Sequence, residues 1–411
     1  MKLEYFIAKR LITTKEYKSS ISAPIIKIAI TAIALGIIMM IVSIATGIGL
    51  QQKIRQKVSA FNGHIIISSF TDNQSDVSTK PISIHQKFYP QFKNLKGIDH
   101  VQAVASKAGI IRTETAFEPI LYKGVGKDYK WDYIKEYLVS GRVPNLMNEL
   151  TSEILISEYL ANRLNLKLND SFNTFFVNEG GNGLPKSRRF KIVGIYNSGF
   201  PEFDASYILG DIRHLQKINK WSKDQIGSFE VFVDDFNSIE EKGKEVYGEV
   251  PSILNSQTIV EKFYYIFEWL KLFDFNIILI IGIMTLVSII NMVVALLVLI
   301  LEKTKMIGIL KSIGASNTSI RKIFLYNALY IILKGLFYGN TIGISLLLIQ
   351  KYFSVVKLNP ESYYVNVAPV DINILYIVIL NIGVVLVSLL ILLIPSFIIS
   401  KISPSKTIRF E

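Results

Sequence analysis

The side chains that carry out chemistry in enzymes are sparse in this sequence and are not arranged for catalysis. The histidines lie far apart, at His64, His85, His100 and His214, and neither H-E-x-x-H nor G-x-S-x-G occurs. The long apolar runs contain no Asp or Glu, which argues against a proton relay or an ion-coupled transporter. We therefore predict no catalytic residues, no metal site and no cofactor bound by this chain.

A phosphate-binding loop is also missing from the sequence. Gly126-Lys127 and Gly243-Lys244 lack both the upstream glycine and the following hydroxyl residue of G-x-x-x-x-G-K-[ST]. Because no other Gly-Lys pair approaches that pattern, we expect that the chain does not hydrolyse ATP itself.

The most informative local pattern is a basic stretch at residues 302–324, EKTKMIGILKSIGASNTSIRKIF. Its apolar residues recur at helical spacing, which predicts a short helix with one apolar face made of Met306, Ile309, Leu310 and Ile313. Gly314 is a natural helix stop, and Ser316 or Asn317 is suited to cap the next helix. Two interpretations remain open: a basic loop whose apolar face lies among lipid headgroups, or a docking element for a partner protein.

This stretch lies between long apolar runs that define the fold class. The chain has 411 residues, half of them hydrophobic, and four segments exceed the roughly 20 residues that cross a bilayer. We predict transmembrane helices at 25–50, 274–301, 323–350 and 372–400. The third contains Lys334, for which a polar contact inside the helix bundle and snorkelling toward headgroups or water are both open interpretations.

Lys and Arg in the short flanking segments predict the orientation of the helices. The first 27 residues hold six, the 302–322 loop five and the 401–411 tail three, whereas the 351–371 loop holds two. By the positive-inside rule the segment 1–24, the 302–322 loop and the tail are cytoplasmic. The net charge of +12 is spread over these flanks and the outer region, without the basic stripe and interleaved aromatic residues of a nucleic-acid interface.

Residues 51–273 then form one large domain on the opposite side, which we predict to be α+β. Strands are expected at 64–69 and around VQAVASKAGIIRT, EPILYKGVG and FKIVGIY, and helices at DIRHLQKI and SIEEKGKEV. In SEILISEYLANRLNLKLNDSF a strand leads into a helix with Leu160, Leu164 and Leu168 on one face. Cysteine is absent, so the domain must fold without disulfides.

Both ends of this domain are predicted to be helical stalks. QQKIRQKVSAF continues the first apolar run without a breaker, and SQTIVEKFYYIFEWLKLFDF, from Ser256, runs without a breaker into the second. Aromatic residues cluster where the second stalk would leave the lipid, which favours an interfacial belt over a ligand cage; they are Phe263, Tyr264, Tyr265, Phe267, Trp269, Phe273 and Phe275.

The stretch EKTKMIGILKSIGAS resembles the coupling-helix signature of FtsX-like ABC transporter permeases, with Met306 departing from that signature. The tail LLIPSFIISKISPSKTIRFE is similar to the family's ending, through Pro395, Pro404, Arg409 and Glu411. The resemblance implies that the residues coupling the permease to its ATPase are Glu302, Lys303, Lys305, Ile307, Gly308, Ile309, Leu310, Lys311, Ile313, Gly314 and Ala315.

Three further stretches resemble the lipoprotein-releasing (Lol) transmembrane subunits: FNGHIIIS, FKIVGIYNSGFPEFDASYI and LNPESYYVNVAPVDI. The resemblance covers nearly the whole chain, in the same order. It implies four transmembrane helices with a large α+β periplasmic domain inserted between the first and second, in a bacterial inner membrane.

The function that the resemblance implies is the extraction of lipoproteins from that membrane, driven by ATP hydrolysis in a partner. The expected partners are two cytoplasmic ABC ATPase subunits that use ATP and Mg, a second permease copy or a paralogue, the lipoprotein, a periplasmic carrier and membrane lipid, but no nucleic acid. Two alternatives are an efflux permease of the MacB type and a signalling protein that, like FtsX itself, activates cell-wall hydrolases.

Overall fold

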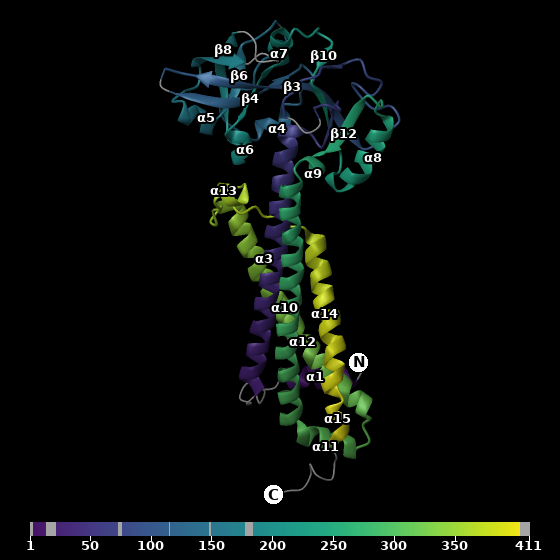
Figure 1. The fold of residues 1–411 in the computed structure, drawn as a ribbon. Coiled ribbons are helices and arrows are strands. Elements are labelled where there is room, and N and C mark those ends of the chain that lie inside the picture. Colours follow the sequence, from purple (N-terminus) through teal and green to yellow (C-terminus); the bar gives the residue numbers. More distant parts are fainter. Residues whose placement is uncertain are drawn as a thin grey trace. The chain divides into compact units, whose positions relative to one another are not determined.

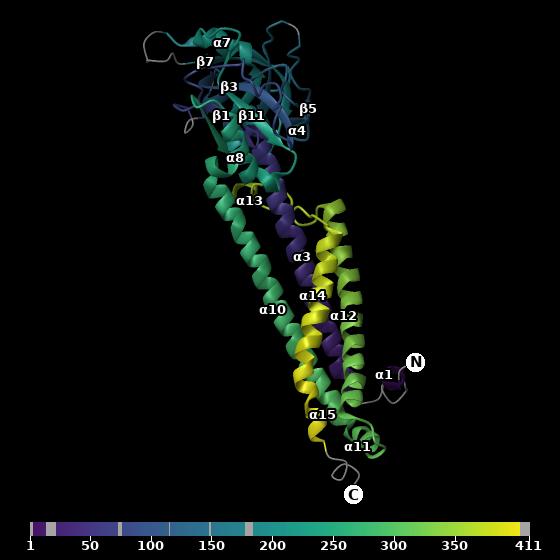
Figure 2. The same cartoon turned by 90° about the vertical axis from the view of Figure 1, so that its right-hand side faces the viewer.

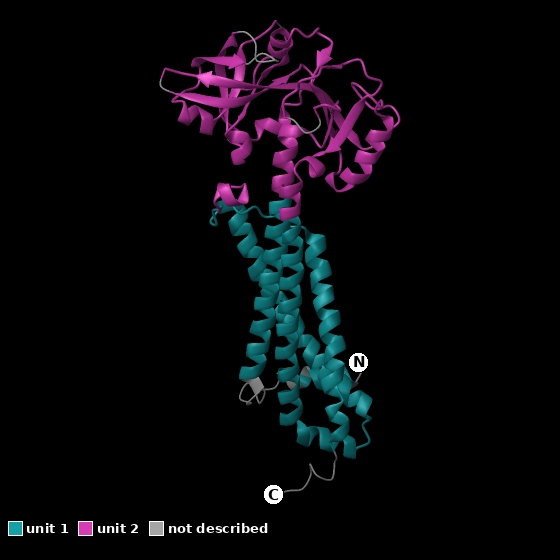
Figure 3. Cartoon of the chain, viewed as in Figure 1, with its two compact units in different colours: residues 1–51, 270–357, 367–411 teal, residues 52–269, 358–366 magenta. Residues whose placement is uncertain are grey.

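The computed structural model describes residues 3–13, 22–72, 76–114, 116–147, 149–176 and 184–402. They divide into two compact units (Figure 3): unit 1 comprises Met1–Gln51, Leu270–Lys357 and Val367–Glu411, and unit 2 comprises Gln52–Trp269 and Leu358–Asn366. Pro404, Arg409 and Glu411, which carried the resemblance of the tail, lie outside the described residues.

Unit 1 is helical (Figure 1). Its elements are α1 (Leu3–Thr13), most of α3 (Ser22–Asn62), most of α10 (Tyr264–Glu302), α11 (Thr304–Ser312), α12 (Asn317–Phe353), α14 (Ile374–Ser396) and α15 (Ile398–Lys401). Within the described residues, four helices are long and apolar enough to cross a membrane: Pro24–Asn62, Tyr264–Glu302, Asn317–Phe353 and Ile374–Lys401. Each overlaps one of the four runs predicted from the sequence.

The packing of α3 against α12 depends on a glycine repeat. Gly335, Gly339 and Gly343 recur every four residues, so they share one face of α12. A Cβ atom added to Gly339 would lie 2.7 Å from Cβ of Ile37 and 2.9 Å from the carbonyl oxygen of Ala34. The two backbones therefore approach as closely as in other small-residue membrane contacts. Figure 2 shows α3, α12 and α14 running alongside one another.

Asn340 and Lys334 are two of the polar residues of α12. Asn340 and Asn381 of α14 exchange side-chain hydrogen bonds of 2.7 and 2.9 Å, so each amide is satisfied within the helix pair. Lys334 is exposed, with its ammonium 4.6 Å from the ring centre of Tyr330. Of its two interpretations, a contact inside this chain's own bundle is therefore wrong.

Unit 2 is built on a mixed sheet of ten strands, in the order β12-β1-β11-β3-β4-β9-β6-β8-β5 with β7 bridging β3 and β8. The strand pairs β4–β9 and β6–β8 are parallel, and the other pairs of described strands in this sheet are antiparallel. The bounds are β1 (Ile65–Ser69), β3 (Ile98–Arg112), β4 (Phe117–Val125), β5 (Leu138–Gly141), β6 (Glu153–Ser157), β7 (Ser171–Phe176), β8 (Lys186–Tyr196), β9 (Tyr207–Asp211), β11 (Ser228–Val233) and β12 (Leu254–Thr258).

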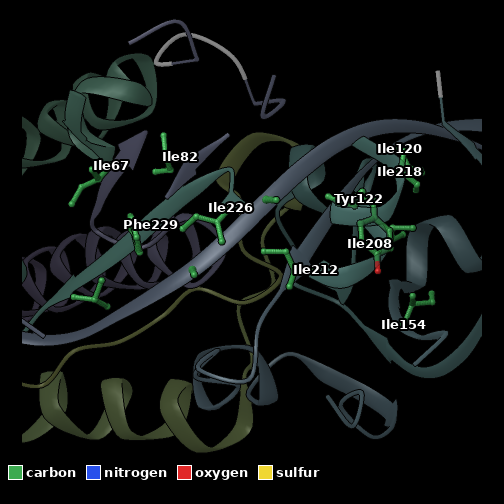
Figure 4. Close-up of a cluster of buried hydrophobic side chains, with 14 of the residues drawn as sticks. Ile67, Ile82, Ile120, Tyr122, Ile154, Ile208, Ile212, Ile218, Ile226 and Phe229 are labelled. Carbon is green, nitrogen blue, oxygen red and sulfur yellow. The ribbon is translucent and has the colours of Figure 1, made fainter. Parts of the chain in front are cut away.

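A two-stranded sheet and short helices complete unit 2. They are β2 (Ile82–Ser83) with β10 (Gln225–Ile226), α4 (Asp132–Lys135), α5 (Glu158–Arg163), α6 (Pro201–Asp204), α7 (Ile212–Asn219), the 3-10 turn η1 (Phe236–Ser238), α8 (Ile239–Glu249), α9 (Ile259–Lys262) and α13 (Pro360–Tyr363). The alternating inward residues of the strands form one apolar core with the inner faces of α5, α7 and α8 (Figure 4). The predicted α+β class is confirmed.

Two predicted helices differ from the structure. The helix after β6 ends at Arg163, because Asn165 adopts a left-handed conformation with φ 52°, and Leu168 lies beyond it. The second stalk is not one helix from Ser256: residues 254–258 form β12 beside β1, and Phe263 separates α9 from α10. Tertiary strand pairing overrides the helical pattern there.

The predicted aromatic belt is only partly a belt. Phe267 is buried and stacks on Phe236 at 5.9 Å, and Trp269 packs edge-on against Tyr364 at 5.6 Å. Phe263 also contacts a ring of unit 2, whereas Tyr264, Tyr265 and Phe275 are exposed. Part of this cluster therefore belongs to the core of unit 2.

Candidate functional site

The basic stretch forms a short helix, α11, whose end is fixed by glycine. The N–H of Ala315 donates to the carbonyl of Leu310 (2.9 Å) and the N–H of Gly314 to that of Lys311 (3.0 Å). Together with φ +95° at Gly314 this is a Schellman motif. The hydroxyl of Ser316 then accepts from the N–H of Ser319 (3.2 Å) and caps α12, so of the two predicted caps Ser316 is the one used.

The apolar face of α11 is not the one that its spacing predicted. Ile307 and Gly308 are buried, and Met306 and Leu310 are partly buried against the helical core of unit 1. Ile309 and Ile313, which the prediction placed on the same face as Met306 and Leu310, point outward with exposed fractions of 53% and 78%. The prediction failed because the packing of α11 in unit 1 sets its rotation.

The outward face therefore contains Lys305, Ile309 and Ile313, four residues apart along the helix. At the end of α10, the carboxylate of Glu302 forms an ion pair of 2.8 Å with the ammonium of its neighbour Lys303. Exposed isoleucines at helical spacing are suited to a groove on another protein.

Lys311 has a structural role that the sequence did not suggest. Its ammonium donates to the carbonyl oxygens of Ile399 (2.8 Å) and Ile402 (2.7 Å), at the end of α15. A cation at a helix C-terminus satisfies unpaired carbonyls and interacts favourably with the helix dipole. Burial of the ammonium lowers the pKa of Lys311. The side chain is thus a cap for α15 rather than part of the outward surface.

A second cluster brings together, within unit 2, the three stretches that resembled Lol subunits. Phe61, at the end of α3, stacks on Phe203 at 4.9 Å and lies 5.5 Å from the ring of Tyr196. Gly63 follows with φ +69°, a conformation that turns the chain into β1. His64 then accepts a hydrogen bond at Nδ1 from the N–H of Val233 (2.9 Å).

The loop after β8 is held by a buried carboxylate. Asp204 accepts from the hydroxyl of Ser198 (2.7 Å), from its N–H (3.1 Å) and from the N–H of Gly199 (2.9 Å). Burial raises the pKa of Asp204 despite these donors. The loop presents Phe200, which stacks on Tyr364 at 4.5 Å.

The segment between α12 and α14 meets the end of α3 at this loop. Tyr364 closes α13 in a left-handed conformation, and its carbonyl accepts from the ammonium of Lys57 (2.9 Å). The amide of Asn366 lies beside Gly199. Three stretches that are separated by more than 100 residues in the sequence therefore form one contact cluster.

A buried ion pair anchors the same end of α3. The ammonium of Lys123 in β4 lies 2.5 Å from a carboxylate oxygen of Glu230 and 2.5 Å from the carbonyl oxygen of Phe61. Gln102 donates to the other carboxylate oxygen at 2.9 Å, and burial lowers the pKa of Lys123. Sequence reasoning missed this pair; its only signal was a lysine at an otherwise apolar position of a strand.

The histidines do not gather. His100 and His214 each bond a backbone carbonyl, of Asp128 and Thr151 respectively, and His85 faces Asp224 at 3.5 Å. In the part of the chain that the structure describes, no three His, Asp or Glu side chains are placed to hold a metal ion.

Two family models match this chain. Residues 28–246 match the MacB-like periplasmic core domain, and residues 278–404 match the FtsX-like permease C-terminal domain. The second match includes α11 and the glycine repeat of α12, and the first includes β1 to β11.

Two curated proteins and one solved domain structure are similar to this chain. The lipoprotein-releasing system transmembrane protein LolE of Haemophilus influenzae is 23% identical over 99% of both chains, and LolC of Buchnera aphidicola is 24% identical over 94% of both. The periplasmic region of MacB from Actinobacillus actinomycetemcomitans is 17% identical, with a TM-score of 0.31, and the match covers 48% of this chain and 88% of that one.

The matched models together include parts of all four long helices and the strands β1 to β11 between the first two of them. The chain is a membrane permease subunit, and it belongs to the family of FtsX-like permeases that carry a MacB-like periplasmic core domain.

Proposed function

We propose that this chain is the permease subunit of an ABC transporter that extracts lipoproteins from the inner membrane and passes them to a periplasmic carrier. Two separate cytoplasmic ATPases hydrolyse ATP with Mg, and the permease pairs with a second copy or a paralogue within membrane lipid. The termini and α11 lie in the cytoplasm, and the sheet domain lies in the periplasm. The chain itself catalyses no reaction.

The observation that carries this proposal is that α11 has one side packed in unit 1 and one side exposed. Its inner side is fixed in unit 1 by buried Ile307 and by the bonds of Lys311 to the end of α15. Its outer side offers Ile309 and Ile313 to a partner. A helix held in this way can take up a push from a docked ATPase without unfolding.

The long first helix supports a mechanical role. α3 runs for 41 residues, about 60 Å, and contributes to both units. Its last turn is bonded by Lys123 and packed on Phe203, so a displacement of that turn acts directly on the sheet domain. Relatives that share nearly the full length of this chain are lipoprotein-releasing transmembrane proteins, which supports the substrate.

Substitution on the outer side of α11 tests the docking step. Ile309→Asp with Ile313→Asp places charge in the docking surface while leaving the buried side intact, so we expect loss of ATPase co-purification. Ser312→Asp, at another exposed position of the same helix, is the matched control and should retain the ATPase. Normal co-purification of the double variant would overturn the docking role.

Depletion in the native host tests the substrate. Outer-membrane lipoproteins should accumulate in the inner-membrane fraction on depletion and return to the outer membrane on complementation. Unchanged lipoprotein distribution with increased drug sensitivity would instead support efflux, and unchanged distribution with failed cell separation would support signalling to cell-wall hydrolases.

A further inference from the structure

Unit 2 contains an apolar pocket that the proposed transport cycle does not use. It has a volume of about 630 Å³ and lies between the end of β4, the first turns of α7 and the segment that leads to β10. We name it the α7 pocket. Pockets of this volume hold small molecules of drug size in many proteins.

The walls of the α7 pocket are mainly hydrocarbon. Ile84, Ile212 and Ile226 form part of the lining, and Leu146 and Trp221 face the same space. Ile212 and Ile226 also belong to the core cluster shown in Figure 4. An apolar occupant would therefore displace water from hydrocarbon surface, which favours its binding.

The carboxylates and the side-chain amide of the lining are already bonded to the protein. Asp128 accepts from the N–H of Ala103 (2.6 Å) and the hydroxyl of Tyr89 (3.1 Å). Asp211 accepts from Nε of Arg213 at 2.8 and 2.9 Å. The side-chain amide of Gln216 donates to two backbone carbonyls.

Three further lining residues are exposed lysines: Lys127, Lys217 and Lys223. Among the described residues, none of the three lysines forms an ion pair, whereas the carboxylate of Asp211 is paired with Arg213. The lining of the α7 pocket thus combines an apolar wall with four cations, including Arg213, against the two carboxylates of Asp128 and Asp211. This net positive charge is complementary to an occupant with an anionic end.

The hydrogen bonds of the lining residues favour an aliphatic chain over a peptide as the occupant of the α7 pocket. A peptide would bring backbone N–H and C=O groups into the pocket, and each buried group without a hydrogen-bond partner would weaken its binding. Since the lining carboxylates and the Gln216 amide are engaged, they are not available to pair with such groups. An aliphatic chain has no groups to satisfy.

We propose that the α7 pocket binds a free fatty acid, with the aliphatic chain along the apolar wall and the carboxylate beside Lys217 and Lys223. This site is separate from lipoprotein transport, and the inference does not rest on the proposed function. It gives unit 2 a binding site for free fatty acid from the surrounding medium.

Trp221 provides the readout, because the chain has three tryptophans and only Trp221 lines the pocket. The full chain, labelled with 5-fluorotryptophan and held in phosphatidylcholine nanodiscs, gives ¹⁹F signals that Trp221→Phe assigns. Dodecanoate below its micelle concentration should shift the Trp221 signal saturably and leave the Trp131 signal in place. Dodecyltrimethylammonium, with the same chain and the opposite charge, should bind at least tenfold more weakly.

Charge reversal tests the lysines. Lys217→Glu with Lys223→Glu should weaken dodecanoate binding about tenfold, because each exposed charge pair contributes modestly. Lys167→Glu, an exposed lysine outside the pocket, is the matched control and should bind like the unmodified protein.

Three results would overturn the proposal. Equal, non-saturating shifts at all three tryptophans would mean partition into the bilayer only. Unchanged dodecanoate affinity in the double lysine variant would mean that Lys217 and Lys223 do not bind the carboxylate. Saturable binding of an acidic apolar peptide without binding of dodecanoate would assign the pocket to a protein partner.

Discussion

The ammonium of Lys123 lies 2.5 Å from the carboxylate of Glu230 and 2.5 Å from the carbonyl oxygen of Phe61, with all three groups buried. One cation thus neutralises an acid of β11 and satisfies a carbonyl that the end of α3 leaves unpaired. The end of the first long helix is joined to two strands of the sheet by a single side chain.

Breaking this pair on one side should be severe. Lys123→Met leaves the Glu230 carboxylate buried without its cation, and we expect a loss of about 3–5 kcal/mol in the free energy of unfolding. Lys123→Met with Glu230→Gln removes both charges and should recover part of that loss. Denaturant unfolding of the full chain in nanodiscs, followed by tryptophan fluorescence, measures both.

The exposed pair of Lys135 and Asp132 is the matched control, since Lys135→Met removes a cation from an ion pair of 2.9 Å that faces solvent. Its unfolding curve should superimpose on that of the unmodified chain. Equal effects of Lys123→Met and Lys135→Met would contradict the anchoring role of the buried pair.

Acid should loosen the start of the sheet through His64. Burial lowers the pKa of His64 from 6.5 to about 4, and its Nδ1 already accepts the N–H of Val233. As the pH falls from 6.5 toward 4, the unfolded chain binds this proton and the folded chain does not, so stability is lost in that window. At pH 5 the loss is about 2 kcal/mol.

Hydrogen exchange of β1 and β11, corrected for the intrinsic rate, reports this loss as a lower opening free energy at pH 5 than at pH 7. His64→Asn keeps an acceptor but removes the titration, and should flatten the pH dependence. His85→Asn, at an exposed position, should keep it. Burial also lowers the pKa of His214, so the decisive comparison is between the variants.

The contact between α3 and α12 should tolerate no side chain at Gly339. Gly339→Ala places a methyl group 2.7 Å from Cβ of Ile37, and overpacking of this kind costs about 1–3 kcal/mol. Gly383→Ala in α14, where no atom lies within 4 Å of the new Cβ, is the control and should be neutral or slightly stabilising. Thermal melts in nanodiscs should show a lower Tm for the first variant alone.

Removing the cap on α15 should affect one helix end selectively. Lys311→Met deprives the carbonyls of Ile399 and Ile402 of their donor, so we expect faster hydrogen exchange over residues 396–402. Lys305→Met, on the exposed side of α11, should leave that segment protected. Unchanged exchange in the Lys311 variant would mean that the bonds do not hold α15.

The sequence was sufficient where a pattern depends on neighbours along the chain. The apolar runs identified the four long helices, and β-branched residues identified strands such as Ile65–Ser69 and Phe117–Val125. Gly314 and Ser316 terminate and cap their helices as local rules require. Each of these features is decided within a few residues.

The features that the sequence did not predict depend on contacts with residues far away in the sequence. Residues 254–258 became a strand because β1 lies beside them, although Thr258 and Glu261 carry the T-x-x-E signal of a helix start that would have placed α9. The rotation of α11, which exposes Ile309, is set by contacts with unit 1. The glycine repeat of α12 was readable as a packing motif, but its partner on α3 was not.

The hydrogen bonds from Lys311 to the end of α15 also affect how a force applied to α11 would be distributed among the helices of unit 1. α11 is covalently continuous with the ends of α10 and α12, and this one ammonium adds the end of the fourth long helix. A load applied at Ile309 is therefore shared by three helices rather than two. Losing the ammonium would leave α11 folded and exposed to a partner, but it would disconnect α15 from α11.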